Sequence, residues 1–416
     1  MHPVFRALEI VMRKRFAVVS VLSLLLSTNA FAQDAPVTDC DVYAASAGDP
    51  QRKSNGVALD KINPDLAVPA CEAAVQKYPD SSRLIYQLGR AYQKANDFAA
   101  AMVQYRKAAD QGFAQALYNV GGMYMIGLSV PQDYAQAAAW FRKAADKGNA
   151  NAQYNLGLMY DSGQGVPQDY AQAAELFREA ADQGDAKSQY NLAGKYQDGL
   201  GVPRDYPVAA MWYRKAADQG LAEAQTNLGF MYDTGQGVSQ DYAQAVAWYR
   251  KGADQGDVDA QYDLGVLYED GQGVPQDYAQ AVAWYRKAAE QGYAPAQVNL
   301  GVAYQKGVSV PRDDAQALDW YRKAAEQNYA PAQVSLGVAY QNGLGVPQDY
   351  AQAVAWYRKA VEQGDTLAQY HLGLMYENGL GVPQDYAQAI AWYRKAAQLG
   401  NKEAQQKIDA FNTGKR

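Results

Sequence analysis

A period of 36 residues runs through most of this chain and restricts it to folds in which one structural unit is stacked many times. The clearest marker is tryptophan, because all seven tryptophans, from Trp140 to Trp392, share one register and Leu176 fills the missing slot. The copies follow one another without insertion or deletion, and eight full copies span residues 116–403. Each copy is therefore expected to adopt the same structure and to pack on its neighbours.

Each copy is expected to encode two helices. In the second copy the first helix should run from about residue 152 to 162, where Leu156, Met159 and Tyr160 share one face at helical spacing. Glycine suits the left-handed conformation at a helix end because it has no Cβ atom. A glycine stands at this end in all eight copies: Gly127, Gly163, Gly199, Gly235, Gly271, Gly307, Gly343 and Gly379.

The second helix of this copy should begin after Asp169, whose carboxylate can accept hydrogen bonds from the N–H groups of the first turn. The Gln172 side chain can reach back to the backbone N–H of Asp169. It should end at Gly184. Gly157 lies where the two helices should approach closely, and Phe177 should fill the space beside it. A single pair cannot bury its apolar face alone, so neighbouring pairs are expected to stack into an all-α solenoid.

The repeated motifs Ala-Gln-Tyr-Asn-Leu-Gly-x-Met-Tyr, Gly-x-Gly-Val-Pro-Gln-Asp-Tyr and Ala-Trp-Tyr-Arg-Lys-Ala-Ala resemble those of the Sel1-like repeat family, a relative of the tetratricopeptide repeats. The resemblance implies a right-handed superhelical α/α solenoid of stacked antiparallel helix pairs. Residues 66–115 resemble a plain tetratricopeptide unit, and residues 404–416 are expected to form a capping helix and a tail. The family also implies a role in signalling, envelope assembly or the regulation of exported polysaccharide.

The first 32 residues have the features of a cleaved export signal. A basic cluster at residues 13–15 precedes an apolar stretch of 11 residues, and a small-x-small site at residues 30–32 predicts a mature start at Gln33. The apolar stretch is too short to span a bilayer. We therefore expect a periplasmic or secreted protein that does not span the membrane.

Removal of this signal makes the chain more acidic, because it takes away four basic residues and one acidic residue and moves the net charge from −6 to −9. An acidic surface repels phosphate groups, so we expect no nucleic-acid partner. Export also favours a disulfide between Cys40 and Cys71, the two cysteines of the chain. This bond should tie an irregular N-terminal segment, residues 33–65, to the first helix.

Groups that could carry catalysis are scarce. His371 is the one histidine beyond the predicted signal, and most other copies place Asn or Asp at its position. No motif has the ligand spacing of a metal site, and most aspartates are explained as helix caps. We therefore expect no enzymatic activity, cofactor or metal. β-Lactam hydrolysis, proposed for some cysteine-rich members of the family, stays a remote alternative, since the repeats here contain no cysteine.

The resemblance to tetratricopeptide arrays implies that the first helices line a concave face, where three rows of side chains could bind a partner. Tyrosines offer amphipathic contact area, asparagine amides can donate to and accept from an extended backbone, and acids would favour basic segments. The candidate binding residues are Tyr118, Tyr154, Tyr190, Tyr262, Tyr370, Asn119, Asn155, Asn191, Asn227, Asn299, Asp161, Asp233 and Glu269.

Other interpretations of these rows stay open, because the asparagines could bridge adjacent repeats and the tyrosines could simply pack. If the rows bind, the favoured partner is an extended protein segment, which would make the chain a non-enzymatic scaffold or adaptor of the bacterial cell envelope. The alternative is a module that binds glycans or peptidoglycan fragments by stacking saccharides on tyrosine. The sequence predicts no particular oligomeric state.

Pairs of basic residues such as Arg286-Lys287 recur on the second helices. Glu290 follows four residues after Arg286, and side chains at this spacing can form an ion pair on a helix. We therefore expect the basic charges to be neutralised by acids of the same helix on a solvent-exposed face. The tryptophans, by contrast, are expected in the core beside the aromatic residue of the helix pair.

Overall fold

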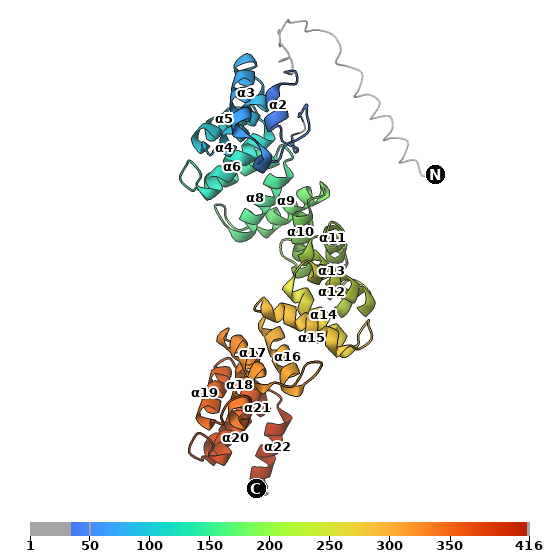
Figure 1. Ribbon diagram of the computed structural model, residues 1–416, viewed down its shortest axis with the longest axis vertical. Coiled ribbons are helices and arrows are strands. Elements are labelled where there is room, and N and C mark those ends of the chain that lie inside the picture. Colours follow the sequence, from blue (N-terminus) through green and yellow to red (C-terminus); the bar gives the residue numbers. More distant parts are fainter. Residues whose placement is uncertain (1–34, 50, 414–416) are drawn as a thin grey trace, which may run out of the picture. The chain divides into compact units, whose positions relative to one another are not determined.

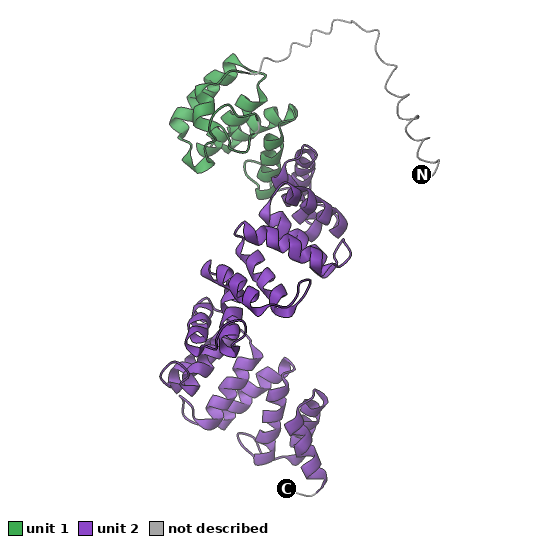
Figure 2. Ribbon diagram, turned by 90° about the vertical axis from the view of Figure 1, so that its right-hand side faces the viewer, with its two compact units in different colours: residues 1–132 green, residues 133–416 purple. Residues whose placement is uncertain are grey.

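The structure, a computed structural model, describes residues 35–49 and 51–413. The predicted signal peptide, residues 1–32, and the predicted mature start at Gln33 lie outside the described residues. The chain divides into two compact units, residues 1–132 and 133–416 (Figure 2). In the ranges described, every regular element is helical, and none of these helices is long and apolar enough to cross a membrane.

The described part of the first unit begins with a short helix (Figure 1), and a single 3-10 turn follows it. Residues 33–65 were predicted to be irregular, which is wrong where these two elements form. The short helix is stabilised because the backbone N–H and the hydroxyl of Thr38 both donate to the Asp41 carboxylate, at 2.9 and 3.0 Å. The elements are α2 (Asp39–Ala44), η1 (Leu59–Lys61), α3 (Pro64–Lys77), α4 (Ser82–Lys94), α5 (Phe98–Asp110) and α6 (Ala114–Ile126).

A disulfide and a buried ion pair hold α2 to the longer helices. Cys40 of α2 and Cys71 of α3 form the predicted bond, with their sulfur atoms 2.01 Å apart. Arg83 of α4 pairs with the Asp41 carboxylate, and Gln87 donates to the same group at 3.1 Å. A buried carboxylate is stable only when it is paired and hydrogen-bonded in this way. The expected attachment of the N-terminal segment is thus present and has a polar component.

The second unit alternates first and second helices of the repeat, and each helix packs against the next along the chain (Figure 1). This is the predicted solenoid of helix pairs. The first helices are α8 (Ala150–Ser162), α10 (Ala186–Asp198), α12 (Ala222–Thr234), α14 (Val258–Asp270), α16 (Ala294–Lys306), α18 (Ala330–Asn342) and α20 (Thr366–Asn378). The second helices are α7 (Tyr134–Ala145), α9 (Tyr170–Asp182), α11 (Tyr206–Asp218), α13 (Tyr242–Asp254), α15 (Tyr278–Glu290), α17 (Asp314–Glu326), α19 (Tyr350–Glu362) and α21 (Tyr386–Gln398), and α22 (Lys402–Asn412) follows the last copy.

The helix ends carry the predicted signals. Asp169 caps α9, because its carboxylate accepts from the backbone N–H groups of Ala171 and Gln172 at 2.9 and 3.0 Å. The helix α8 ends before Gly163, whose φ of 72° is left-handed as expected. The helix α9 ends at residue 182, two residues before the glycine that was expected to terminate it.

The glycine in the middle of each first helix allows that helix to approach an aromatic ring of the second helix. A Cβ atom at Gly265 would lie 2.6 Å from a ring carbon of Tyr285. Carbon atoms in contact prefer about 3.5–4.0 Å, so a side chain here would push the two helices apart. The third copy differs, since Ala193 stands at this position; the next residue, Gly194, has only the Tyr213 hydroxyl within 4 Å, at 3.7 Å. The predicted role of the small residue is confirmed where the ring lies directly over it.

A row of buried glutamines joins consecutive second helices. The amide nitrogen of Gln189 donates to the carbonyl oxygen of Ala181 at 3.1 Å, and its amide oxygen accepts from Gln219 at 2.8 Å. Ala181 belongs to α9 and Gln219 follows α11, so one buried amide links the ends of both helices. A buried amide needs both its donor and its acceptor paired, and this requirement sets the spacing between repeats. The same two bonds recur at Gln225, Gln261 and Gln297.

The last copy breaks this row. Within the described chain the buried amide oxygen of Gln369 has no hydrogen-bond partner. Leu399 stands where Gln219, Gln255, Gln291 and their equivalents supply the donor in other copies. The Leu399 side chain is 59% exposed, so it gains little from burial in return.

The basic residues of the second helices lie over aromatic rings. The Lys287 ammonium lies 3.7 Å from the ring centroid of Trp284, one turn earlier in α15. Trp212, Trp248 and Trp284 are buried as predicted, whereas Trp140, Trp320, Trp356 and Trp392 are only partly buried. Arg286 donates to the Tyr304 hydroxyl of α16 at 3.1 Å. The predicted neutralisation of Arg286 by Glu290 is therefore wrong, because the guanidinium faces the next helix, where it meets a ring and a hydroxyl.

We predict that Gly265→Ala destabilises the protein by about 1–3 kcal/mol, since the new methyl group would overpack the Tyr285 ring. The matched control is Gly194→Ala, which has room for a methyl group and should gain up to about 1 kcal/mol from helix propensity. Urea unfolding followed by circular dichroism measures both. Equal effects of the two substitutions would contradict the proposed contact.

We also predict that Leu399→Gln stabilises the last repeat by about 0.5–1.5 kcal/mol, because the new amide can donate to the unpaired oxygen of Gln369. The reverse change, Gln363→Leu, removes the donor that reaches Gln333 at 2.8 Å and should cost about 1–3 kcal/mol. Thermal unfolding and amide hydrogen exchange of α20 report the two changes. A loss of stability in Leu399→Gln would argue against the glutamine row as a stabilising element.

Candidate binding surface

Tyr154, Asn155, Leu158 and Asp161 share one face of α8, because positions i, i+1, i+4 and i+7 lie together on a helix. We name this face, with the equivalent positions of the other first helices, the first-helix surface. All four side chains in α8 are at least partly exposed. The predicted binding residues lie at these positions, so each row can be compared from copy to copy.

The tyrosine row is half-buried and packs on the second helices. Tyr190 lies 5.6 Å from Tyr213 between ring centroids, and Tyr262 lies 5.7 Å from Tyr285. Tilted pairs at this distance are favourable ring contacts. One side of each ring therefore belongs to the fold, and the remainder is open to solvent. Tyr154 packs on Phe177 and Tyr370 packs on Tyr393 in the same way, and Tyr118 is half-buried.

The asparagine row connects neighbouring repeats. Asn227 of α12 lies within reach of the hydroxyls of Tyr190 and Tyr213, which belong to the preceding helix pair, and it lowers the pKa of both tyrosines against the larger rise caused by burial. Asn299 does the same for Tyr262 and Tyr285. In the first unit Asn119 reaches Tyr86 and Tyr105, and Asn155 and Asn191 are half-buried at the equivalent positions.

Two copies replace this asparagine with an ionisable residue. Burial raises the pKa of the Asp263 carboxyl to about 7, repulsion from Asp233, Asp259 and Asp257 adds to the rise, and the Tyr249 hydroxyl opposes it. The carboxyl is therefore mostly protonated only below about pH 7.

His371 occupies the same position in α20 and stacks on Tyr357, with ring centroids 4.9 Å apart and planes 6° from parallel. Burial lowers its pKa, and the charge of Asp365 opposes that change. The histidine therefore packs on the ring that an asparagine amide would otherwise contact, as expected for substitution on a helix face.

The acidic row accepts hydrogen bonds from the second helices. Glu269 accepts from the Tyr285 hydroxyl at 2.6 Å, and Gln305 and Gln341 accept from the equivalent tyrosines in other copies. The Asp161 carboxylate is paired with Lys195, which neutralises it. Burial raises the pKa of the Asp233 carboxyl. Glu269 also lines a cavity.

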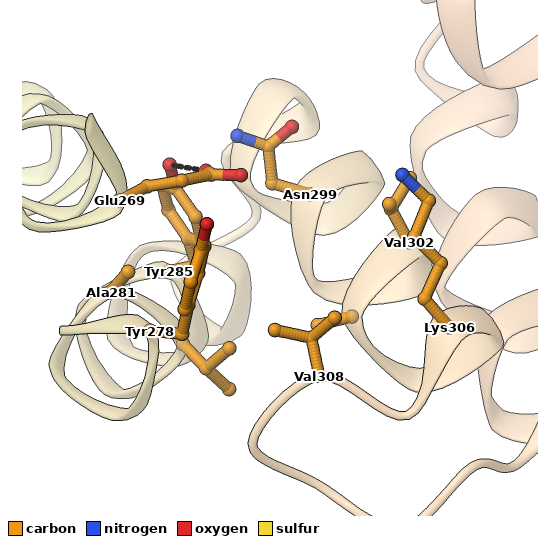
Figure 3. Close-up of a pocket in the computed structure, with 10 residues that line it drawn as sticks. Glu269, Tyr278, Ala281, Tyr285, Asn299, Val302, Lys306 and Val308 are labelled. Atoms are coloured by element: carbon orange, nitrogen blue, oxygen red, sulfur yellow. Dashed lines mark hydrogen bonds between the residues drawn. The ribbon is translucent and has the colours of Figure 1, made fainter. Parts of the chain in front are cut away.

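This cavity, about 410 Å³ in volume, lies between α15 and α16 (Figure 3). It brings together the predicted residues Glu269 and Asn299, with Tyr285 and Val302 beside them. Its volume falls within the range of small-ligand sites in proteins. The other lining residues, which include Tyr278, Lys306 and Val308, were not among the predicted binding residues. The signal that could have revealed them is Ser309, which replaces the second glycine of the loop motif.

Across the described residues no group of three or more His, Cys, Asp or Glu side chains is placed to hold a metal ion. The surface thus offers tyrosine rings, amides and acids at a regular spacing, which is the chemistry of recognition.

Fold and surface together define the class of a helix-pair solenoid scaffold. The chain belongs to the Sel1 repeat family. The family model, described as Sel1 repeat, matches nine consecutive segments: residues 84–113, 114–149, 150–185, 186–221, 222–257, 258–293, 294–329, 330–365 and 366–401. The first of these falls in the part of the chain that resembled a plain tetratricopeptide unit.

Two solved structures are similar over most of the chain. One is a protective antigen present in uropathogenic Escherichia coli strains, which displays an SLR fold. It is 38% identical, with 83% of each chain covered and a TM-score of 0.68. The other, a Sel1 repeat protein from Oxalobacter formigenes, is 37% identical over 74% of this chain and 90% of its own, with a TM-score of 0.58. A search of the curated proteins gives no match.

We predict that Asp263→Asn stabilises the protein above pH 7 and has little effect near pH 4. The folded carboxyl has its pKa raised from 3.8 to about 7, so the native state loses stability as the pH rises through this interval. Asparagine removes that loss, on the order of 2–4 kcal/mol, and restores the amide of the other copies. Urea unfolding between pH 4 and 8 measures the effect. The exposed Asp270→Asn is the control, and a gain that does not vary with pH would contradict the assignment.

Proposed function

We propose that this protein is a non-enzymatic scaffold of the bacterial cell envelope that binds extended segments of partner proteins along its first-helix surface. The observation that carries the proposal is the cavity between α15 and α16, because it places an acid, an amide and apolar side chains of that surface around one opening. Neighbouring copies repeat tyrosine and polar positions at the same interval, which suits an extended chain crossing several repeats.

Exposed apolar side chains on the same surface support a protein partner. Phe230 of α12 is 39% exposed and Leu158 of α8 is 36% exposed, and both occupy the position between the asparagine and acidic rows. Partly exposed aromatic and aliphatic side chains beside polar groups are typical of interface centres. The acidic balance of the chain favours partners with basic segments.

The envelope location rests on the disulfide and on the predicted export signal. A disulfide persists in oxidising compartments such as the periplasm and is rare in the cytosol. The bond and the buried Arg83–Asp41 pair both attach the N-terminal segment that would follow cleavage to the helices after it. We propose a periplasmic or secreted protein on this basis.

The proposal is tested by capture of envelope proteins on the immobilised full chain, followed by mass spectrometry. We expect Phe230→Ala to lower the captured amount at least about fivefold, since loss of a buried aromatic contact at an interface costs 1 kcal/mol or more. Met211→Ala is the matched control, because Met211 is 45% exposed on the second helix α11 and should not affect capture.

Three outcomes would overturn the scaffold proposal. One is recovery of saccharide with no protein partner, which would favour the glycan-binding alternative. Another is equal capture by Phe230→Ala and the parent protein. The third is loss of capture in Met211→Ala alone, which would place the interface on the second helices. Circular dichroism of each variant shows that the helices remain intact.

A further inference from the structure

The cavity between α15 and α16 has two internal counterparts in which a lysine of this chain meets an acid of the acidic row. In the first counterpart Lys195 pairs with the Asp161 carboxylate, and its ammonium lies 4.9 Å from the ring centroid of Tyr170. Asp161 and Tyr170 stand 108 residues, or three repeats, before Glu269 and Tyr278. The carboxylate and the tyrosine ring therefore form a site that holds an ammonium group in this fold.

The second counterpart lies three repeats after the cavity. Lys407 of α22 pairs with the Glu377 carboxylate at 2.8 Å, and Tyr386 lines the same hollow. The lysine comes from a different sequence position than Lys195, yet it reaches the equivalent acid. Two lysines from different sequence positions thus pair with the equivalent carboxylate beside the equivalent tyrosine.

The cavity itself keeps the acid and the tyrosine but has no lysine at the Lys195 position. Ala303 stands there, and it lines the cavity together with Glu269 and Tyr278. Lys195 fills this space in its own copy, whereas the short side chain of Ala303 leaves room for a ligand and an acid for it to pair with. Glu269 keeps its hydrogen bond from Tyr285, which fixes the position of the carboxylate.

The loop beside the cavity also differs from its counterparts. In the third copy the loop residue Gly201 lies so close to the preceding second helix that a Cβ atom would be 2.1 Å from the Tyr170 carbonyl oxygen. The equivalent residue beside the cavity is Ser309, which has a Cβ atom and a φ of 56°. This loop cannot make the same close approach, and Tyr278 is 43% exposed as a result.

We propose, building on the proposed scaffold function, that this cavity binds a lysine side chain of an extended partner segment. The ammonium group pairs with Glu269, and the aliphatic stem lies against the Tyr278 ring and the valines of the cavity. A cation beside both a carboxylate and a tyrosine ring gains from the ion pair and from the ring face. Lys306 lies on the opposite side of the cavity from Glu269 (Figure 3), where it can donate to a backbone carbonyl of the segment.

The test uses two fluorescein-labelled heptapeptides with blocked ends, Ser-Ser-Val-X-Val-Ser-Ser, in which X is lysine or norleucine. Norleucine keeps the aliphatic stem and removes the ammonium group. Fluorescence polarisation with the full chain should show at least about tenfold tighter binding of the lysine peptide. Equal affinity of the two peptides, or no binding of either, would overturn the proposal.

Variants then locate the site. Glu269→Gln should abolish the preference for lysine, and it should fold because Gln197, Gln305 and Gln341 accept the tyrosine hydroxyl at this position in other copies. Glu326→Gln removes the same charge from an exposed position of α17 and should keep the preference. Ala303→Lys supplies an internal lysine, as in the third copy, and should also abolish it. Retention of the lysine preference in Glu269→Gln would sink the inference.

The two proposals can fail separately. If the parent protein captures envelope proteins but does not distinguish the two peptides, the scaffold function stands and the lysine site is wrong. If it distinguishes the peptides through Glu269 but captures no protein partner, the site stands and the scaffold function is wrong.

Discussion

The contact between a small residue in the first helix, a glycine in most copies, and an aromatic ring in the second determines the geometry of the repeat. At Gly265 a Cβ atom would lie 2.6 Å from the Tyr285 ring, so glycine lets these two helices approach closely, whereas the third copy has Ala193 at this position. The ring lies over the backbone, and its hydroxyl then reaches the acidic row of the first helix. Contacts between repeats build on this pair: the asparagine of the next first helix lies within reach of the same hydroxyl, and the glutamine row joins the second helices.

Much of this architecture follows from the sequence because it rests on local signals repeated at a fixed interval. The capping aspartates, the left-handed glycines and the helical spacing of apolar residues each act within a few residues of one another. The glutamine row could not be predicted from local signals of this kind. Gln189 is polar and lies in a helix, which would normally favour solvent, yet it is buried because its partners come from two other helices. The partner of Arg286 was predicted wrongly for a similar reason. Glu290 is its nearest acid in the sequence, but the guanidinium lies over the Tyr304 ring of the next helix.

The candidate surface, too, was predictable from the sequence only in part. The sequence identified the tyrosine, asparagine and acidic rows, but identical residues in successive copies serve mainly the contacts that every copy must make. Asn227 and Asn299 lie within reach of tyrosine hydroxyls of the preceding pair, and Asp161 is paired within the chain. Differences between copies are more informative. Asp263 and His371 replace a bridging amide, and Ala303 and Ser309 together open a cavity that the rest of the repeat would fill.

A repeat of this kind can acquire a binding site without loss of its scaffold. The acidic row needs only an oxygen that accepts from a tyrosine hydroxyl, and Gln305, Gln341 and Glu269 all meet that requirement. Charge at this position is therefore free to vary while the fold is kept. The residue that covers the carboxylate can vary as well, as Lys195 and Ala303 illustrate. Because stability is a sum over neighbouring pairs, an opening in one copy weakens only its own interface, and recognition can be confined to that copy.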